Sequence, residues 1–266
     1  MSLIEVEALS YGYQGTERMV VHDISFTLDG GEVMCIIGPN GAGKSTLLNV
    51  MVGMLPASHG RVTLEGIDVS RMNRAHIARF IGYVTQSKTP SFGYSVIDYT
   101  VMGRAAHVAL CKMPSSSDYE RAWAGLRRMG VEDLAYRNYL ELSGGERQQV
   151  DIARAIVQDP RLIILDEPTS ALDFGNQAKV IDVVGQLRDE GYAVLLTTHD
   201  PNHAIMLGSK VGVLETGGAM VVGEAGEIIS EEILSKTYRT DVRIEYMDKV
   251  KREVCTIMGT VPKTIT

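Results

Sequence analysis

The chain has 266 residues, of which 45% are hydrophobic, enough to bury an ordinary core in one domain with a subdomain or an extension. Its 26 basic and 33 acidic residues give a formal charge of −7, which disfavours nucleic acid as a partner because counterion release needs the opposite sign. The cysteines Cys35, Cys111 and Cys255 form neither a metal-binding pair nor an even disulfide set, and indicate a reducing compartment. The N-terminus lacks a signal-peptide pattern, and no apolar run approaches the roughly 20 residues that cross a bilayer, so a membrane role would depend on a partner.

Residues 4–26 alternate apolar and polar side chains around a turn-like stretch at 11–15, which predicts antiparallel strands at the edge of a sheet. Another strand is predicted at 62–64. Further short apolar runs alternate with segments of helical spacing, the pattern of an α/β domain. Because these runs are apolar on both faces, they predict buried parallel strands at 33–37, 81–84, 162–165 and 193–197.

Between residues 87 and 160 the pattern changes, because 119–129 and 146–158 have helical spacing and no strong strand run interrupts them. Pro160 ends the second of these helices. We therefore predict a core at 1–86 and 161–235, an inserted helical subdomain at 87–160, and a C-terminal extension at 236–266. Weak alternation in the extension predicts a small strand pair, and its role cannot be read from the sequence.

A glycine-rich segment between the predicted strand 33–37 and a helical run at 46–52 fits the P-loop pattern. Its residues are Gly38, Pro39, Asn40, Gly41, Ala42, Gly43, Lys44 and Ser45. Glycines let several backbone N–H groups point at one phosphate, and the helix start adds its positive dipole end. We expect Lys44 to reach the β- and γ-phosphates and the Ser45 hydroxyl to bind Mg²⁺. A P-loop alone leaves kinases, GTPases and recombinases as alternatives.

Two acids follow the predicted strand 162–165, at the carboxyl edge of the sheet where ligands bind in this architecture. We assign Asp166 to the Mg²⁺ shell, directly or through water, and Glu167 to the attacking water beyond the γ-phosphate. His199 follows the strand 193–197 and reaches the same edge. There it can contact the γ-phosphate and orient Glu167.

A further motif, Leu142-Ser143-Gly144-Gly145-Glu146, precedes the second predicted helix. Together with the P-loop and the strand acids it resembles the signature of ABC (ATP-binding cassette) ATPases, and the resemblance covers residues 1 to about 235. It implies the α/β class: a P-loop NTPase (RecA-like) core with an antiparallel β edge and an inserted α-helical subdomain. Glu146 departs from the Gln that family members often carry, and an ionised carboxylate does not donate the hydrogen bond that an amide can donate from this position.

The resemblance also implies site residues for ATP and Mg²⁺. The implied nucleotide-binding residues are Tyr13, Gly38, Pro39, Asn40, Gly41, Ala42, Gly43, Lys44, Ser45, Thr46 and Gln86. Tyr11 is the alternative to Tyr13 as the aromatic that stacks on the base. Ser45, Gln86 and Asp166 are implied to bind the metal, and Glu167 and His199 to catalyse hydrolysis. In such cassettes a second copy of the chain docks head to tail, and its nucleotide is contacted by Ser143, Gly144, Gly145, Glu146 and Asp173.

Residues 92–104 and 166–177 resemble the importer ATPases that serve iron chelates, haem, cobalamin and molybdate or tungstate, with the molybdate/tungstate branch nearest. This implies membrane permease subunits as partners, a solute-binding protein indirectly, and a peripheral location on the cytoplasmic face of the cell membrane. Residues 86–110 would meet the permease, so substitution of Tyr94 or Arg104 should uncouple ATP hydrolysis from transport. The alternative is a soluble ABC ATPase that acts on DNA or the ribosome. Against it, the segment between Gln86 and the signature is short and carries no heptads.

Overall fold

The computed structural model describes residues 2–15, 18–85, 93–109, 112–208 and 210–258. Within them, six strands form a central sheet in the order β10-β9-β3-β8-β7-β6. All neighbours are parallel except β10 and β9. The bounds are β3 Val33–Ile37, β6 Ile81–Val84, β7 Leu162–Asp166, β8 Ala193–Thr198, β9 Lys210–Leu214 and β10 Met220–Glu224. The four predicted parallel strands are thus confirmed, with β7 and β8 each one residue longer.

Side chains of the central strands alternate between two hydrophobic cores, as strand geometry requires. In β3, Cys35 and Ile37 face a core shared with the helical subdomain, with α6 (Phe174–Asp189) and with α7 (Pro201–Leu207). Met34 and Ile36 face the opposite core, which contains α1 (Lys44–Met51). Because both faces are covered, every residue of β3, β7 and β8 is buried, which explains why these strands are apolar up to Asp166 at the end of β7 and the two threonines at the end of β8.

A second, antiparallel sheet has the order β2-β1-β4-β5. Its strands are β1 Ile4–Gly12, β2 Met19–Leu28, β4 His59–Leu64 and β5 Ile67–Asp68. Strands β1, β2 and β4 were predicted and β5 was not, and the strands form a sheet of their own instead of lying at the edge of the parallel sheet. Their inward residues, such as Val6 and Ile24, pack on the core that contains α1, so the two sheets enclose this helix instead of joining edge to edge. The antiparallel edge of the central sheet is β10.

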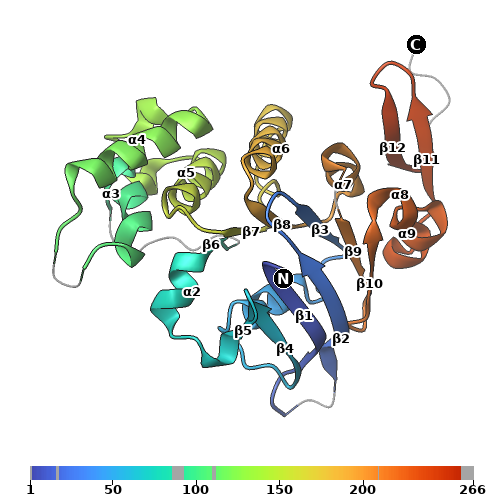
Figure 1. Cartoon of the computed structure of the whole chain (residues 1–266). Coiled ribbons are helices and arrows are strands. Elements are labelled where there is room, and N and C mark those ends of the chain that lie inside the picture. The colour runs from blue at the N-terminus through green and yellow to red at the C-terminus, as the bar shows by residue number, and fades with distance from the viewer. Residues whose placement is uncertain (1, 16–17, 86–92, 110–111, 209, 259–266) are drawn as a thin grey trace.

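The helical subdomain lies beyond β6 at one end of the molecule (Figure 1). Its elements are α3 Val96–Val101, η2 Met102–Ala106, α4 Ser116–Met129, η3 Glu132–Leu134, η4 Tyr139–Glu141 and α5 Gly144–Val157. The two predicted helices are confirmed as α4 and α5, each starting earlier than expected because a capping box, at Ser115 and Ser143 respectively, fixes its first turn. Residues 86–92 lie outside the described part, so the boundary of this subdomain at residue 87 stays a prediction. The remaining helical elements of the core before β6 are η1 Val69–Arg71 and α2 Arg74–Phe80.

The C-terminal elements gather at the opposite end of the molecule, beside β10 and α7 (Figure 1). They are α8 Ala225–Ile228, α9 Glu231–Tyr238, β11 Val242–Met247 and β12 Arg252–Ile257. The predicted strand pair of the extension is confirmed as the antiparallel hairpin β11–β12. Across the described ranges of the chain, none of the helices is both long and apolar enough to span a bilayer.

Candidate functional site

The glycine-rich loop connects the end of β3 to the first residue of α1, as predicted. Gly43 caps the helix with φ 109°, and a Cβ there would lie 2.8 Å from the Val20 carbonyl oxygen. Gly41 has φ 78°. At Gly38 a Cβ would come within 2.4 Å of the Leu214 carbonyl oxygen. The path of the loop therefore requires glycine for two separate reasons, left-handed backbone and close approach of other chain segments.

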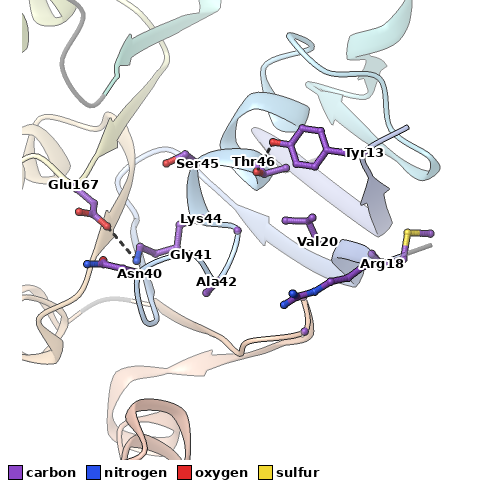
Figure 2. A pocket seen from close by; sticks show the side chains of 14 residues that line it. Tyr13, Arg18, Val20, Asn40, Gly41, Ala42, Lys44, Ser45, Thr46 and Glu167 are labelled. Carbon is purple, nitrogen blue, oxygen red and sulfur yellow. Dashed lines mark hydrogen bonds and ion pairs between the residues drawn. The ribbon is translucent and has the colours of Figure 1, made fainter. Parts of the chain in front are cut away.

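A cavity of about 630 Å³ opens over this loop (Figure 2). Residues from five stretches of the chain line it: Tyr13, Arg18, Met19, Val20, Asn40, Gly41, Ala42, Gly43, Lys44, Ser45, Thr46, Glu167, Gly217 and Gly218. Sequence reasoning did not single out residues 18–20 or the 217–218 turn. The 217–218 turn is held in place because the His22 N–H donates to the Gly218 carbonyl at 2.8 Å. This contact joins distant segments, so a local sequence pattern does not predict it.

The structure distinguishes the two aromatic candidates by their exposure. Tyr13 is 46% exposed on the wall of the cavity, and its hydroxyl lies 3.0 Å from the Thr46 hydroxyl (Figure 2). Tyr11 is buried at 8% and packs edge-on against the Tyr13 ring, with centroids 5.1 Å apart. Only Tyr13 of this pair therefore presents a ring face to a molecule in the cavity.

Lys44 and Glu167 meet above the loop. Lys44 Nζ lies 3.1 Å from Glu167 Oε1 and donates to the Gly38 carbonyl at 2.8 Å (Figure 2). The side chains of this ion pair are only 5% and 12% exposed. The Lys44 ammonium is thus held at the base of the cavity, where it can exchange a carboxylate for a phosphate.

One threonine orients both strand acids. The Thr197 hydroxyl donates to Asp166 Oδ1 at 2.7 Å, and its oxygen accepts the Glu167 N–H at 2.9 Å. Glu167 has φ 49°, a left-handed backbone that costs a non-glycine residue about 1–2 kcal/mol and that this bond helps to hold. Thr197 was missed at the sequence level. Its signal was a hydroxyl inside an otherwise apolar run, next to Asp166 in the register of β7 and β8.

His199 lies at the same edge of the sheet, as predicted. Its Nδ1 is 3.9 Å from Glu167 Oε2, beyond hydrogen-bond distance, and its side chain is 53% exposed. Lys44 and Glu167 thus line the cavity, while His199 lies next to Glu167 and is not itself among the residues that line it. Gln86, the remaining predicted nucleotide and metal residue, lies outside the described residues.

The residues assigned to the nucleotide of a second copy do not line this cavity. Ser143 caps α5 and forms a reciprocal capping box with Glu146, whose carboxylate accepts the Ser143 N–H at 2.7 Å. That bond lowers the pKa of Glu146, which is therefore ionised at neutral pH. Asp173 caps α6 by accepting the Asn176 N–H at 2.9 Å, and this bond likewise lowers its pKa.

The signature and the segment before α6 form one continuous surface. A Cβ added to Gly145 would lie 3.4 Å from Leu172 Cδ2, and one added to Gly144 would lie 4.0 Å from Ala171 Cβ. In addition, the Gln149 amide of α5 donates to Asn176 of α6 at 3.3 Å. The predicted cross-dimer residues are therefore neighbours of one another.

The donors near the loop fit Mg²⁺. Ser45 offers an exposed hydroxyl and Asp166 a buried carboxylate, while within the described ranges no three His, Cys, Asp or Glu side chains gather as a metal site. Mg²⁺ accepts such a sparse set of oxygen donors because it retains waters and takes substrate phosphate oxygens as ligands. Tighter-binding transition metals would need a denser set of nitrogen or sulfur ligands.

A second cavity, which we name the subdomain groove, separates the core from the helical subdomain and has a volume of about 520 Å³. Its lining includes Val52, Gly53, Met54, Arg74, Ile77, Ala78, Met102, Gly103, Arg154, Ala155 and Gln158. Met54 is 59% exposed there. The groove thus combines apolar side chains with two arginines.

Arg104 does not present its side chain to a partner, so the effect of its substitution on coupling stays a prediction that direct contact does not support. Its side chain is only 10% exposed, because Nε donates to Asp118 Oδ1 at 3.0 Å and Nη1 donates to the Val157 carbonyl at 3.1 Å. Arg104 therefore joins the segment after α3 to α4 and α5 inside the subdomain. Tyr94, by contrast, is 37% exposed.

Comparison with known proteins gives matches across most of the chain. A family model described as ABC transporter matches residues 21–170, more than half of the sequence. An uncharacterized ABC transporter ATP-binding protein of Haemophilus influenzae is 39% identical over 90% of this chain and 90% of its own. The molybdate import ATP-binding protein MolC of the same organism is 34% identical over 88% of this chain and 87% of its own. A solved structure described as an inward-facing ABC transporter of metal-chelate type matches with a TM-score of 0.85 at 30% identity, covering 98% of this chain and 99% of its own.

Proposed function

This chain belongs to the ABC transporter family as an ATP-hydrolysing cassette, and from that premise we propose that it powers the import of a metal-containing solute through a membrane permease. The support is similarity: one relative imports molybdate, and a structural match over nearly the whole chain is of metal-chelate type. Molybdate or tungstate, an iron chelate, haem and cobalamin remain the candidate solutes. The relatives give no support to a soluble cassette that acts on DNA or the ribosome.

ATP binding follows from the cavity over the glycine-rich loop. The base stacks on the exposed ring of Tyr13, and the backbone N–H groups at the start of α1 receive the phosphates. Lys44 then exchanges Glu167 Oε1 for the β- and γ-phosphates. Its aliphatic stem is already buried, so the exchange moves only the ammonium end.

Glu167 acts as the general base in this proposal. With Lys44 on the phosphates, the carboxylate accepts a proton from the attacking water, and His199 contacts the γ-phosphate and orients that carboxylate. Thr197 holds the backbone of Glu167 and the carboxylate of Asp166 in place. Ser45 and Asp166, with Gln86, would hold Mg²⁺, which supplies neutralisation of phosphate charge when bound.

A second copy completes each site. Ser143 and the following two glycines present a hydroxyl and N–H groups at the start of α5, an anion-binding arrangement without a lysine. Because this surface lies outside the chain's own cavity, we place it on the nucleotide of a head-to-tail partner, together with Glu146 and Asp173. Two Mg-ATP then lie between the two copies, and hydrolysis of this ATP lets the two copies separate.

We place the permease in the subdomain groove, on the cytoplasmic face of the cell membrane, with a solute-binding protein joined only through the permease. The groove lies where the core meets the subdomain, so an inserted helix would sense their relative movement. Its exposed methionine and its arginines suit an amphipathic helix with an acidic or polar end.

The test is to isolate the tagged chain from native membranes in mild detergent and to identify its partners by mass spectrometry. We expect a polytopic permease and a solute-binding protein. The variant Met54→Asp, in the groove, should lose the permease and keep ATP hydrolysis. Met113→Asp, 86% exposed and outside the groove lining, is the matched control and should keep both. Ribosomes or DNA in the eluate, or a permease retained by Met54→Asp, would contradict the proposal.

A further inference from the structure

Two elements of the C-terminal extension contact the segment that contains His199. The Tyr238 hydroxyl, at the end of α9, donates to the His199 carbonyl at 3.1 Å. In β12, the Cys255 N–H donates to Asn202 Oδ1 at 2.9 Å, and Asn202 Nδ2 donates to the Cys255 carbonyl at 3.1 Å. Residues 199–202, which we name the switch segment, are therefore bonded to two separate parts of the extension.

The bonds of Asn202 hold the switch segment from both sides. Asp200 caps α7 and accepts the Asn202 backbone N–H at 2.9 Å. Asn202 Nδ2 also donates to Asp200 Oδ1 at 2.9 Å, so one amide joins this cap to β12. The reciprocal pair with Cys255 has the form of a β-ladder rung made by a side chain, which fixes both distance and orientation.

Tyr238 stays a hydrogen-bond donor over the whole physiological pH range. Burial, followed by the nearby carboxylate of Asp200, raises the pKa of its hydroxyl. The hydroxyl therefore keeps its proton and the bond that it donates to the His199 carbonyl.

The side chain of His199 needs such support. The imidazole is 53% exposed, and its Nδ1 is 3.9 Å from Glu167 Oε2, too far for a hydrogen bond to set its direction. The backbone sets the direction of the Cα–Cβ bond, and this direction limits the positions that the ring can reach through its side-chain rotamers. A positioning error of about 1 Å in a reacting group can cost two orders of magnitude in rate.

We propose that α9 and the β11–β12 hairpin position His199 for ATP hydrolysis, with Tyr238 and Asn202 as the positioning residues. The inference rests on the role given above to His199. It assigns a purpose to residues 231–257, whose strand pair has mostly exposed side chains and adds little to either core.

The first test is the steady-state kinetics of Tyr238→Phe, with the second variant Asn202→Ala. Loss of one neutral hydrogen bond corresponds to about a 3- to 10-fold fall in kcat. We expect that fall with the KM for ATP unchanged and with the thermal midpoint close to that of the wild type. Tyr246→Phe, which removes the hydroxyl of a 62% exposed tyrosine on β11, is the matched control and should leave kcat unchanged. A change confined to KM would mean that Tyr238 acts on nucleotide binding and would overturn the proposal.

A double-mutant cycle separates this inference from the role of His199 itself. In the background of His199→Ala, Tyr238→Phe should cause no further loss of single-turnover rate, because the group that it positions is gone. Equal losses in both backgrounds would show a general structural role and refute the inference. If His199→Ala alone leaves the rate unchanged, the assignment of His199 fails instead. If it lowers the rate but Tyr238→Phe and Asn202→Ala do not, only the inference fails.

Discussion

Glu167→Gln should bind ATP more tightly and hydrolyse it far more slowly. In the structure the Glu167 carboxylate lies 3.1 Å from Lys44 Nζ in a largely buried pair, so ATP must compete with it for the ammonium. At an effective dielectric constant of about 20, the attraction amounts to about 5 kcal/mol. A glutamine keeps a charge-assisted hydrogen bond of about 1.5–3 kcal/mol, so moving the ammonium from this side chain to the phosphates becomes about 2–3.5 kcal/mol easier. That difference corresponds to about 30- to 300-fold tighter binding of ATP.

The rate of ATP hydrolysis should fall in Glu167→Gln, although the affinity for ATP rises. Removing a general base costs about 10²- to 10⁴-fold, so turnover of Glu167→Gln should fall by that factor. Phosphate release measures the turnover, titration calorimetry with Mg-ATP measures the affinity, and light scattering at saturating ATP should show a stable dimer. Glu32→Gln is the matched control, because it changes another Lys–Glu pair, with Lys210 at 2.7 Å, outside the nucleotide cavity. Its affinity and turnover should stay close to those of the wild type.

Two results would refute this reasoning separately. If Glu167→Gln keeps turnover within a few-fold of the wild type, Glu167 is not the general base. If turnover collapses while affinity is unchanged or weaker, the Lys44 pair does not compete with the nucleotide, and the ion pair is not an obstacle to binding.

The remaining predictions concern the subdomain, the signature and the loop. Arg104→Ala should lower the free energy of unfolding by about 2–4 kcal/mol in urea titrations, because it leaves Asp118 without its buried cation; an unchanged midpoint would contradict this. Ser115 and then Arg104 lower the pKa of Asp118 to about 2, below its unfolded value, so its stabilisation exists above about pH 4 and is lost between about pH 4 and 2. In Asp118→Asn, the urea midpoint should therefore change less with pH over that range than it does in the wild type. Glu146→Gln keeps the helix cap without its charge and should lower the ATP concentration needed for dimerisation about two- to fivefold, as measured by light scattering. Gly43→Ala, at φ 109°, should abolish nucleotide binding in calorimetry while circular dichroism stays native.

The nucleotide loop and the central strands were predictable because their information is local. A buried parallel strand must be apolar on both faces, and the turn from β3 into α1 needs glycine at fixed positions such as Gly43. Those constraints are written in consecutive residues. The same holds for the starts of α4 and α5. The sequence offers Ser115 to Asp118 as N-caps before α4, and Ser115 is the cap in the structure, whereas the cap at Ser143 was not predicted.

What was missed depends on contacts between distant segments. Thr197 orients Glu167 only through the register of β8 against β7, and 30 residues separate the two positions. Arg104 carries a charge that indicates the surface, yet Asp118 and the Val157 carbonyl satisfy it inside the subdomain. The place of the antiparallel strands also depended on which core their inward faces share, since alternation alone does not say which sheet a strand joins.

Helix α5 links the two surfaces on which the proposed function depends. Its first turn carries the signature, and its last turn lines the subdomain groove, so both lie on one rigid element of 14 residues, about 21 Å long. The Tyr99 hydroxyl of α3 donates to Asp151 in the middle of this helix at 2.8 Å, and Gln149 bonds Asn176 of α6. A permease helix that shifts α5 at the groove must therefore move the signature and pull on the start of α6 at the same time. Because a packed helix moves as a rigid body, we infer that α5 transmits movement between the groove and the cross-dimer surface. This transmission requires no conformational change in the nucleotide loop.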